Sequence, residues 1–279
     1  MFSRLKLFLF ERNSKVMGEN FGLENMKILH FEEVSSTNTI LRDMMADGCD
    51  VAGTVIVAGH QTAGKGMGEN RWESEPNKNL LFSIALNVSF LKAEEQFKIS
   101  QAVAVAILNV ISPKLLTPSN SSNSLNSSIS SNSSNPSISS NPSNPSISSN
   151  SSNPSIKWPN DVYVGSKKLA GMLIQNSISG IMMQTTIIGI GLNVNQLKFG
   201  KDIPNPVSLK MLTGNEFDLE KLLNELIVNI NDAVEDLRTE HGKEIIDAAY
   251  RNNLFRCGEW AEYDYKGEVK TMIINGYDK

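Results

Sequence analysis

Glycines and a lysine are combined in the segment from Gly59 to Gly68, where four glycines surround Lys65. The segment comes directly after the apolar, β-branched run 54–58, which predicts a buried strand. Glycines let the backbone approach a ligand closely and turn N–H groups towards an anion. A lysine ammonium adds a point charge suited to phosphate. We therefore interpret this segment as an anion-binding loop.

A P-loop of the NTPase type is an alternative interpretation of the same residues. The stretch from Gly59 to Lys65 satisfies the pattern G-x-x-x-x-G-K, the core of that motif. However, Gly66 stands where a serine or threonine should ligate Mg²⁺, and Gly66-Met67-Gly68 is a poor first turn for the helix that a P-loop opens. The P-loop is therefore the weaker interpretation.

A second set of polar residues runs from Lys157 to Asp161 and continues at Lys168. Pro159 restricts the backbone between Trp158 and the two polar residues that follow it. Asp161 and Lys168 lie on neighbouring predicted strands joined by a tight turn at Gly165-Ser166. This arrangement predicts a cation and a carboxylate at one cleft.

The elements that must position these residues follow from hydrophobic periodicity and from capping residues. Strands are expected at 27–33, 54–58, 79–87, 161–164, 168–175 and 182–192, and a hairpin at 260–274 around Lys266-Gly267. Helices are expected at 37–47, 94–110, 218–238 and 243–254, the first capped by Ser35 or Ser36 and the third by Asp218. The pattern is that of an α+β protein with a mixed sheet and helices.

The composition limits the classes of function. The 279 residues are 40% hydrophobic and carry a net charge of −4, so we expect a globular protein without a nucleic-acid partner. The longest apolar stretches fall short of the ~20 residues of a transmembrane helix, so no membrane partner is expected. Two cysteines far apart, Cys49 and Cys257, suit a reducing cytoplasm.

Three segments differ in character from the expected catalytic domain, 26–256. Residues 1–25 are predicted to be a disordered or mis-started tail, because Met17 and Met26 are alternative starts. Residues 117–155 are almost only Ser, Asn, Pro and Ile, which predicts a disordered insert within the domain. The final segment, 257–279, holds only two strands and is predicted to be an incomplete C-terminal β domain.

Four blocks of the sequence, in order, resemble the catalytic domain of biotin–protein ligases. The blocks are Ser35-Ser36-Thr37-Asn38; Gln61-Thr62-Ala63-Gly64-Lys65-Gly66 leading to Arg71-Trp72; Lys157-Trp158-Pro159-Asn160-Asp161 with Lys168-Leu169-Ala170-Gly171; and Gly189-Ile190-Gly191-Leu192-Asn193-Val194-Asn195. Each block alone is common, whereas the ordered set is specific to this family. The resemblance implies a class II synthetase-like α+β fold with a truncated C-terminal β-barrel stub.

The resemblance also implies the roles of individual residues. Ser36, Thr37 and Gln61 would hydrogen-bond the ureido ring of biotin, and Lys168 would be the main catalytic lysine, with Lys65 as the second. The implied biotin-binding set is Ser36, Thr37, Asn38, Gln61, Gly64, Lys65, Gly66, Lys168 and Gly171. The implied ATP-binding set is Lys65, Trp72, Asn160, Asp161, Lys168 and Asn193, with Asp161 also a ligand of Mg²⁺.

An ATP-dependent ligase of this family forms biotinyl-5′-AMP and transfers biotin to a lysine of a biotin carboxyl carrier protein. Many relatives begin with a DNA-binding domain. Only about 35 residues precede Ser36 here, fewer than a domain of usual size, so the ligase-only form is expected. Family members often form homodimers, and no local feature decides the oligomeric state.

The sequence departs from the family in its glycine-rich loop, which is usually arginine-rich. Lys65, Met67 and Asn70 stand at the three arginine positions. Lysine cannot form the bidentate phosphate contact of arginine, and methionine carries no charge. We expect the adenylate to be held less tightly and to leak, so that lysines are labelled promiscuously.

Two further functions stay open beside the biotin ligase. Lipoate–protein ligases share the adenylate chemistry, but their R-R-x-x-G-G-G run is absent from this sequence. A non-catalytic sensor of biotin or nucleotide is favoured by the missing arginines and by the short C-terminal segment.

Overall fold

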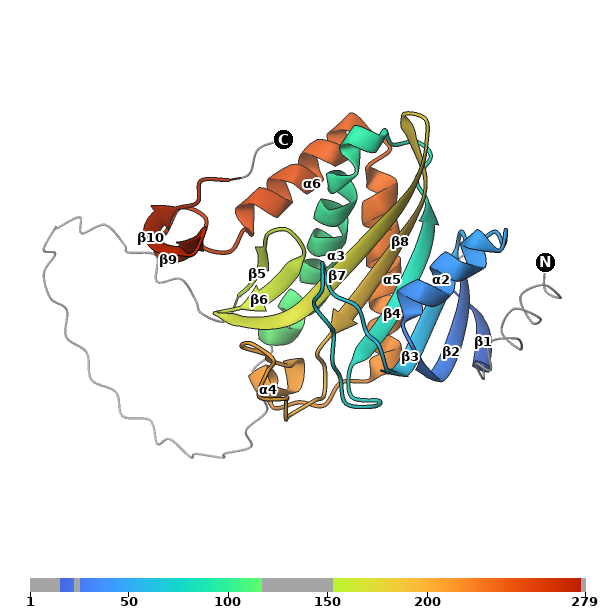
Figure 1. Ribbon diagram of the computed structural model, residues 1–279, viewed down its shortest axis with the longest axis horizontal. Helices are drawn as coiled ribbons and strands as arrows, with labels where there is room; N and C mark the ends of the chain where they lie inside the picture. The colour runs from blue at the N-terminus through green and yellow to red at the C-terminus, as the bar shows by residue number, and fades with distance from the viewer. Residues whose placement is uncertain (1–15, 23–25, 117–152, 277–279) are drawn as a thin grey trace, which may run out of the picture.

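An eight-stranded mixed sheet forms the centre of the protein (Figure 1), in a computed structural model that describes residues 16–22, 26–116 and 153–276. The strands lie in the order β1-β2-β3-β4-β8-β7-β6-β5. β2 and β3 are parallel, and the other neighbours are antiparallel. The strands are β1 (Val16–Gly22), β2 (Met26–Val34), β3 (Thr54–Gln61), β4 (Leu80–Asn87), β5 (Pro154–Lys157), β6 (Asp161–Val164), β7 (Lys167–Ser179) and β8 (Met182–Leu192).

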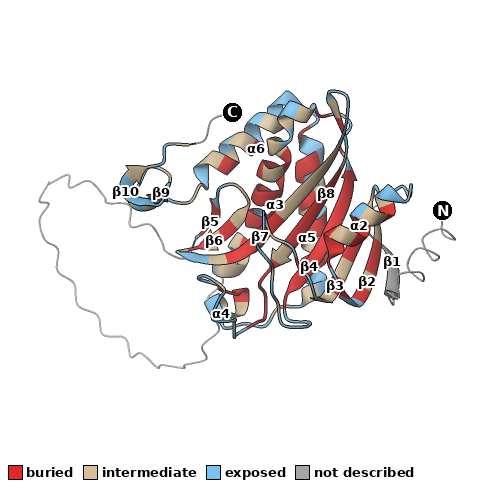
Figure 2. Ribbon diagram, viewed as in Figure 1, coloured by how far each residue is buried: buried red, intermediate tan, exposed pale blue. Residues whose placement is uncertain are grey.

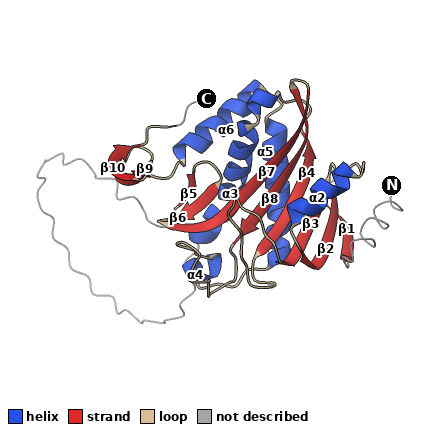
Figure 3. Cartoon of the chain, in the orientation of Figure 1, coloured by secondary structure: helices blue, strands red, loops and turns tan. Residues whose placement is uncertain are grey.

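Helices cover both faces of this sheet (Figures 1 and 3). Three long helices, α3 (Phe97–Leu116), α5 (Leu219–Asp236) and α6 (Glu240–Asn252), pack on one face. The other face carries α2 (Thr37–Ala46), which packs on β3, β4 and β8. The short helices are η1 (Ala93–Glu95) and α4 (Leu209–Thr213).

The sheet separates two hydrophobic cores, because successive side chains of a strand point to opposite faces. Ile188 and Ile190 belong to the larger core, with α3 and α5. Ile187 belongs to the smaller core, with α2. The buried residues of both layers are concentrated in the central strands and in α3 (Figure 2).

One segment, Ala93–Leu116, is apolar and long enough to span a membrane by length and composition. Of its most apolar 18-residue window, 61% is buried inside the protein. The long core helix α3, enclosed by α5, α6 and the sheet, accounts for this composition.

Capping confirms two of the predicted helix starts. The Asp218 side chain accepts a hydrogen bond from the Lys221 N–H at 3.1 Å and begins α5. Ser36 occupies the N-cap position of α2, but its side chain makes no capping hydrogen bond. Helix α6 begins at Glu240, three residues earlier than predicted, because the Thr239 hydroxyl accepts from the Gly242 N–H.

The predicted strands and the C-terminal hairpin are confirmed, with several corrections. The hairpin is formed by β9 (Trp260–Tyr265) and β10 (Glu268–Ile273), a separate two-stranded sheet. The tail predicted at 1–25 contains strand β1, which pairs with β2. The first strand after the insert begins at Pro154, and α4 was not predicted. Of the insert predicted to be disordered at 117–155, residues 117–152 lie outside the described residues, and its predicted end is wrong because Pro154 and Ser155 belong to β5.

Candidate active site

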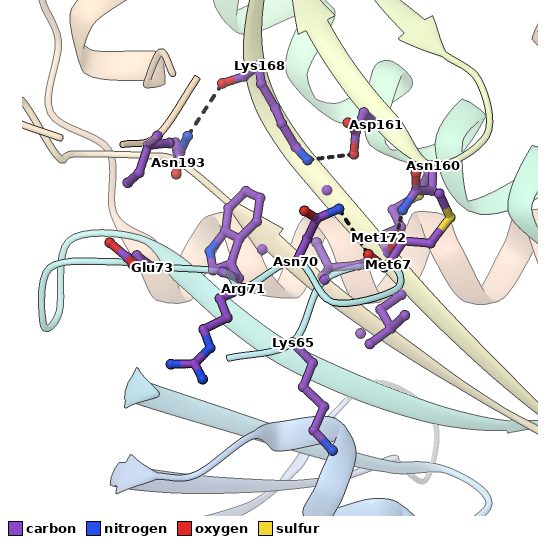
Figure 4. A pocket seen from close by; sticks show the side chains of 18 of the residues that line it. Lys65, Met67, Asn70, Arg71, Glu73, Asn160, Asp161, Lys168, Met172 and Asn193 are labelled. Atoms are coloured by element: carbon purple, nitrogen blue, oxygen red, sulfur yellow. Dashed lines mark hydrogen bonds and ion pairs between the residues drawn. The ribbon is translucent and has the colours of Figure 1, made fainter. Parts of the chain in front are cut away.

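A cavity of about 560 Å³ lies against the face of the sheet that carries α2, between the glycine-rich loop and the ends of β6, β7 and β8 (Figure 4). Of the thirteen site residues predicted from the sequence, twelve line it, and Gly64 lies beside the lining residues Gln61 and Trp72. The twelve are Ser36, Thr37, Asn38, Gln61, Lys65, Gly66, Trp72, Asn160, Asp161, Lys168, Gly171 and Asn193.

The floor of the cavity is formed by glycines of β8 on which two side chains rest. Gly189 lies between Ser83 of β4 and Leu173 of β7 in the strand register. The Asn38 amide crosses all three strands, because its Nδ2 donates to the Leu173 carbonyl at 3.1 Å and its Oδ1 contacts the Ser83 hydroxyl. A Cβ at Gly189 would lie 2.0 Å from Asn38 Oδ1, so only glycine fits this position.

Two residues further along the same face, Gly191 supports the Trp72 indole. A Cβ at Gly191 would lie 2.3 Å from Trp72 Cε2, and one at its cross-strand partner Gly171 would lie 3.0 Å from Trp72 Cζ3. The indole therefore rests on this glycine pair. Its Nε1 is buried and has no hydrogen-bond partner within the described part of the chain. Gly171 was expected to contact biotin, and in the structure its missing side chain leaves room for Trp72 and Lys168.

A polar cluster forms one end of the cavity, where α2 begins. The Gln61 Oε1 accepts hydrogen bonds from the Thr37 backbone N–H at 2.8 Å and, by distance, contacts the Thr37 hydroxyl at 3.2 Å. The Ser83 hydroxyl lies 2.7 Å from Thr37 Oγ1. The loop is fixed to the helix start because the Ala63 N–H donates to the Ser35 carbonyl. This end offers several polar groups in fixed positions inside a largely buried wall.

A charged pair forms the other end of the cavity. The Lys168 ammonium lies 2.8 Å from Asp161 Oδ1, and both side chains are less than one third exposed. The ammonium also lies 5.5 Å from the centre of the Trp72 ring. Lys168 is held on both sides, since its N–H donates to the Asn205 carbonyl and its carbonyl accepts from Val207. The predicted meeting of Asp161 and Lys168 is confirmed by this geometry.

The amides of Asn160 and Asn193 have structural partners beside this pair. Asn160 Nδ2 donates to the Met172 carbonyl at 2.8 Å. Asn193 Nδ2 donates to the Val207 carbonyl at 3.0 Å. Both amides thus fix the backbone around Lys168, whatever contact their remaining oxygen atoms make with a ligand.

Lys65 lies on the wall of the same cavity, but its side chain points away from Lys168 (Figure 4). Lys65 pairs with Arg71 in an antiparallel bridge, and Trp72 N–H donates to the Gly64 carbonyl. Lys65, Arg71 and Trp72 all line the cavity, but because side chains alternate along paired strands, the Trp72 side chain points the opposite way from those of Lys65 and Arg71. The structure therefore does not bring the two ammonium groups together in this conformation.

The hairpin also excludes the P-loop interpretation. Gly59 and Gln61 belong to strand β3, and the chain after Lys65 turns back through Gly66, whose N–H donates to the Asn70 carbonyl. A P-loop instead leads into a helix at this point.

Sequence analysis missed a part of the cavity wall that lies beyond the four blocks. This part consists of Phe199, Asp202, Ile203, Pro204 and Pro206. It is an irregular segment without a periodic pattern, so only its proline content indicated a fixed loop. Ser83, which lies behind the wall and contacts Thr37 and Asn38, was also missed, because a serine inside an apolar strand carries no motif of its own.

No group of three or more His, Cys, Asp or Glu side chains that could hold a metal ion occurs among the residues that the structure describes. Asp161, which was predicted to be a ligand of Mg²⁺, is paired with Lys168.

The fold and the cavity together define a ligand-binding α+β domain in which a polar pocket and a charged pair share one chamber. The sequence model of the Biotin/lipoate A/B protein ligase family matches residues 30–193, more than half of the chain. The chain belongs to this family.

Individual members of the family are similar to this chain in sequence and in structure. The chain is 23% identical over 273 residues to a biotin–[acetyl-CoA-carboxylase] ligase of Mycobacterium tuberculosis, covering 97% of this chain and 87% of the relative. Among solved structures, the biotin protein ligase of Aquifex aeolicus in complex with biotin and ATP is similar, with a TM-score of 0.64, 22% identity, and coverage of 90% and 88%. The biotin protein ligase of Leishmania major with biotinyl-5-AMP gives a TM-score of 0.57 at 21% identity, covering 90% and 87%. These two structures share the fold.

Proposed function

We propose that this protein is an ATP-dependent biotin–protein ligase of the cytoplasm, which forms biotinyl-5′-AMP and transfers biotin to a lysine of a biotin carboxyl carrier protein. The observation that carries the proposal is the single cavity that joins the polar end at Thr37 and Gln61 to the Lys168–Asp161 pair. The similar proteins support the choice within the family, since one is a biotin–[acetyl-CoA-carboxylase] ligase and two are solved biotin protein ligases that hold biotin with ATP or biotinyl-5-AMP.

The polar end favours biotin over lipoate. The ureido ring of biotin carries two N–H donors and one carbonyl acceptor, whereas the dithiolane ring of lipoate has neither. Buried polar groups that lose their partner cost free energy. The Thr37 and Gln61 side chains therefore favour a ring that can satisfy them, and the absence of a matching group penalises the dithiolane.

The first chemical step joins two negatively charged groups. A carboxylate oxygen of biotin attacks the α-phosphorus of ATP, the bond from that phosphorus to the bridging oxygen breaks, and pyrophosphate leaves. The Lys168 ammonium, held by Asp161 at 2.8 Å, offsets the repulsion and stabilises the charge on the α-phosphoryl oxygens. Much of the remaining rate gain comes from holding both reactants in one chamber.

The second step transfers the biotinyl group. The amine of the carrier lysine attacks the acyl carbon of the mixed anhydride, the bond from that carbon to the phosphate oxygen breaks, AMP leaves, and the amine loses a proton. The hairpin from Gly64 to Trp72 lies over the chamber and, in our proposal, limits the access of water to the anhydride.

Magnesium is proposed to reach the site with the nucleotide. Mg²⁺ is usually held by one or two carboxylates together with the phosphates of the substrate. Because Asp161 is paired with Lys168 and no described cluster adds further ligands, we assign the protein no independent magnesium site.

Pyrophosphate exchange tests the proposed function. The protein is incubated with ATP, Mg²⁺ and labelled pyrophosphate, and with biotin, lipoate or neither. We expect label to enter ATP only with biotin. Exchange with lipoate alone indicates a lipoate ligase, and binding of biotin without exchange indicates a non-catalytic sensor.

A further inference from the structure

Ser83 lies behind the polar end of the cavity, in the middle of strand β4, and is fully buried. It belongs to none of the four sequence blocks and does not line the cavity. Its hydroxyl oxygen lies 2.5 Å from Asn38 Oδ1 and 2.7 Å from Thr37 Oγ1. Ser83 thus connects the structural amide of Asn38 to the hydroxyl of Thr37, which does line the cavity.

Asn38, Ser83 and Thr37 form a series of hydrogen bonds, and the Asn38 amide determines which group donates and which accepts in each bond. Its Nδ2 must face the Leu173 carbonyl, 3.1 Å away, because that carbonyl can only accept. Oδ1 therefore faces Ser83, and two oxygens 2.5 Å apart need a proton between them. The Ser83 hydroxyl has one proton, and it must donate that proton to Asn38.

The proton of Ser83 also determines the role of the Thr37 hydroxyl. The two oxygens of Ser83 and Thr37 lie 2.7 Å apart. Because Ser83 has given its only proton to Asn38, it offers Thr37 a lone pair, and we infer that the Thr37 hydroxyl donates to it. The Thr37 hydroxyl then has no second proton for Gln61 Oε1, which already accepts from the Thr37 backbone N–H at 2.8 Å. Thr37 Oγ1 is left as an acceptor towards the cavity.

We propose that Ser83 is a specificity-determining residue of the ligase, because it fixes the Thr37 hydroxyl as a hydrogen-bond acceptor for a ureido N–H of biotin. The inference rests on the proposed function and goes beyond it, since it assigns a role to a buried side chain that does not touch the substrate. Ser83 acts through Thr37 as a positioning residue.

The test compares two variants in which a buried hydroxyl is removed. Ser83→Ala breaks this series of hydrogen bonds at its centre. Thr186→Val is the matched control, because Thr186 is fully buried in the adjacent strand β8, faces the opposite core, and has no hydrogen-bond partner in the described structure. For both variants, KM for biotin and for ATP is measured by pyrophosphate exchange, and folding is checked by thermal unfolding.

Loss of one oriented hydrogen bond predicts a rise of about ten-fold in KM for biotin in Ser83→Ala. KM for ATP and the value of kcat at saturating biotin stay within two-fold of the wild type, and Thr186→Val changes none of them. Should Ser83→Ala unfold, Ser83→Cys keeps a weak donor in a similar volume and is expected to give an intermediate KM for biotin.

A second readout isolates the polarity of Thr37. Two carbamate analogues of biotin replace one or the other ureido N–H with a ring oxygen, which can only accept. The wild type is expected to bind one of them about ten-fold more weakly than biotin, because two acceptors then face each other. In Ser83→Ala the Thr37 hydroxyl is released and can donate, so this preference becomes smaller.

The outcomes separate the two proposals. A wild-type protein that exchanges pyrophosphate with biotin, together with a Ser83→Ala variant of unchanged KM and unchanged preference between biotin and the analogues, overturns the role of Ser83 alone. An equal rise of the KM values for biotin and ATP also overturns it, since a general loss of packing explains that result. A wild type without biotin-dependent exchange overturns the proposed function and this inference with it.

Discussion

Gly191→Ala tests the contact between the sheet floor and the Trp72 indole. The added Cβ would lie 2.3 Å from Trp72 Cε2 and 2.6 Å from Nε1, more than an ångström inside ordinary contact, which is ~3.5–4.0 Å between carbon atoms. Overpacking of this kind typically costs about 1–3 kcal/mol. For a protein of this size we expect the melting temperature to fall by roughly 2–12 °C. We also expect KM for biotin to rise, because the displaced indole enters the cavity.

The assay is a double-mutant cycle with Trp72→Ala, followed by thermal unfolding and by pyrophosphate exchange. If the clash is with Trp72, then Gly191→Ala costs little further stability in the Trp72→Ala background. Gly200→Ala is the control, since the nearest atom to its added Cβ is Glu73 Oε2 at 3.6 Å. Two results would refute the packing argument. One is that Gly191→Ala changes neither the melting temperature nor KM for biotin, and the other is that it lowers stability equally in the wild type and in Trp72→Ala.

Three further predictions concern charges. Lys168→Ala should lower the rate of biotin-dependent pyrophosphate exchange by about 10²–10³-fold, the usual effect of losing one preorganised electrostatic contact, and near-normal exchange would remove Lys168 from the catalytic residues. Met67→Arg should reduce the biotinylation of lysines outside the carrier, because it restores a charge near the adenylate; mass spectrometry that finds biotin only on the carrier lysine in the unchanged protein contradicts the predicted leak. Burial raises the pKa of Glu95, but the hydrogen bonds from Lys243 at 2.8 Å and from the Lys92 N–H outweigh it, so that this pKa is lowered. A lowered carboxyl pKa adds stability above the unfolded value of about 4.3, and this stability is lost as the pH falls through the folded pKa. Urea unfolding should therefore show that Glu95→Gln is less stable than the wild type at pH 7, by roughly 1 kcal/mol or less. This difference in stability should become smaller below about pH 5, and a difference that is the same at both pH values would contradict the prediction.

The sequence predicted well those helices and strands whose apolar residues follow a clear pattern. Strand β8 ends where it was expected, and α5 begins after the Asp218 cap. These elements are determined by local patterns, namely an apolar run and a capping side chain. Strand β1 was missed because its residues, Val16–Gly22, show no alternation of apolar and polar side chains, and their pairing with β2 is what makes them a strand.

The sequence predicted which residues form the candidate site, but not the contacts that these residues make. The blocks placed Asp161 and Lys168 on strands joined by a tight turn, and a local turn fixes such a pair. The reasons for the two glycines of β8 could not be read from the sequence, because Asn38 and Trp72 reach them from distant parts of the chain. The orientation of Lys65 depends on its pairing with Arg71, which no periodicity indicated.

In our proposal, one chamber brings the acid end of biotin to the α-phosphorus of ATP beside Lys168. The most direct measurement is the transfer of biotin to a purified biotin carboxyl carrier domain, with ATP and Mg²⁺, followed by intact mass spectrometry of the carrier. We expect the mass of one biotinyl group on the carrier and AMP in equal amount, and neither product without ATP. An unmodified carrier together with ATP hydrolysis that is independent of biotin would contradict the proposal.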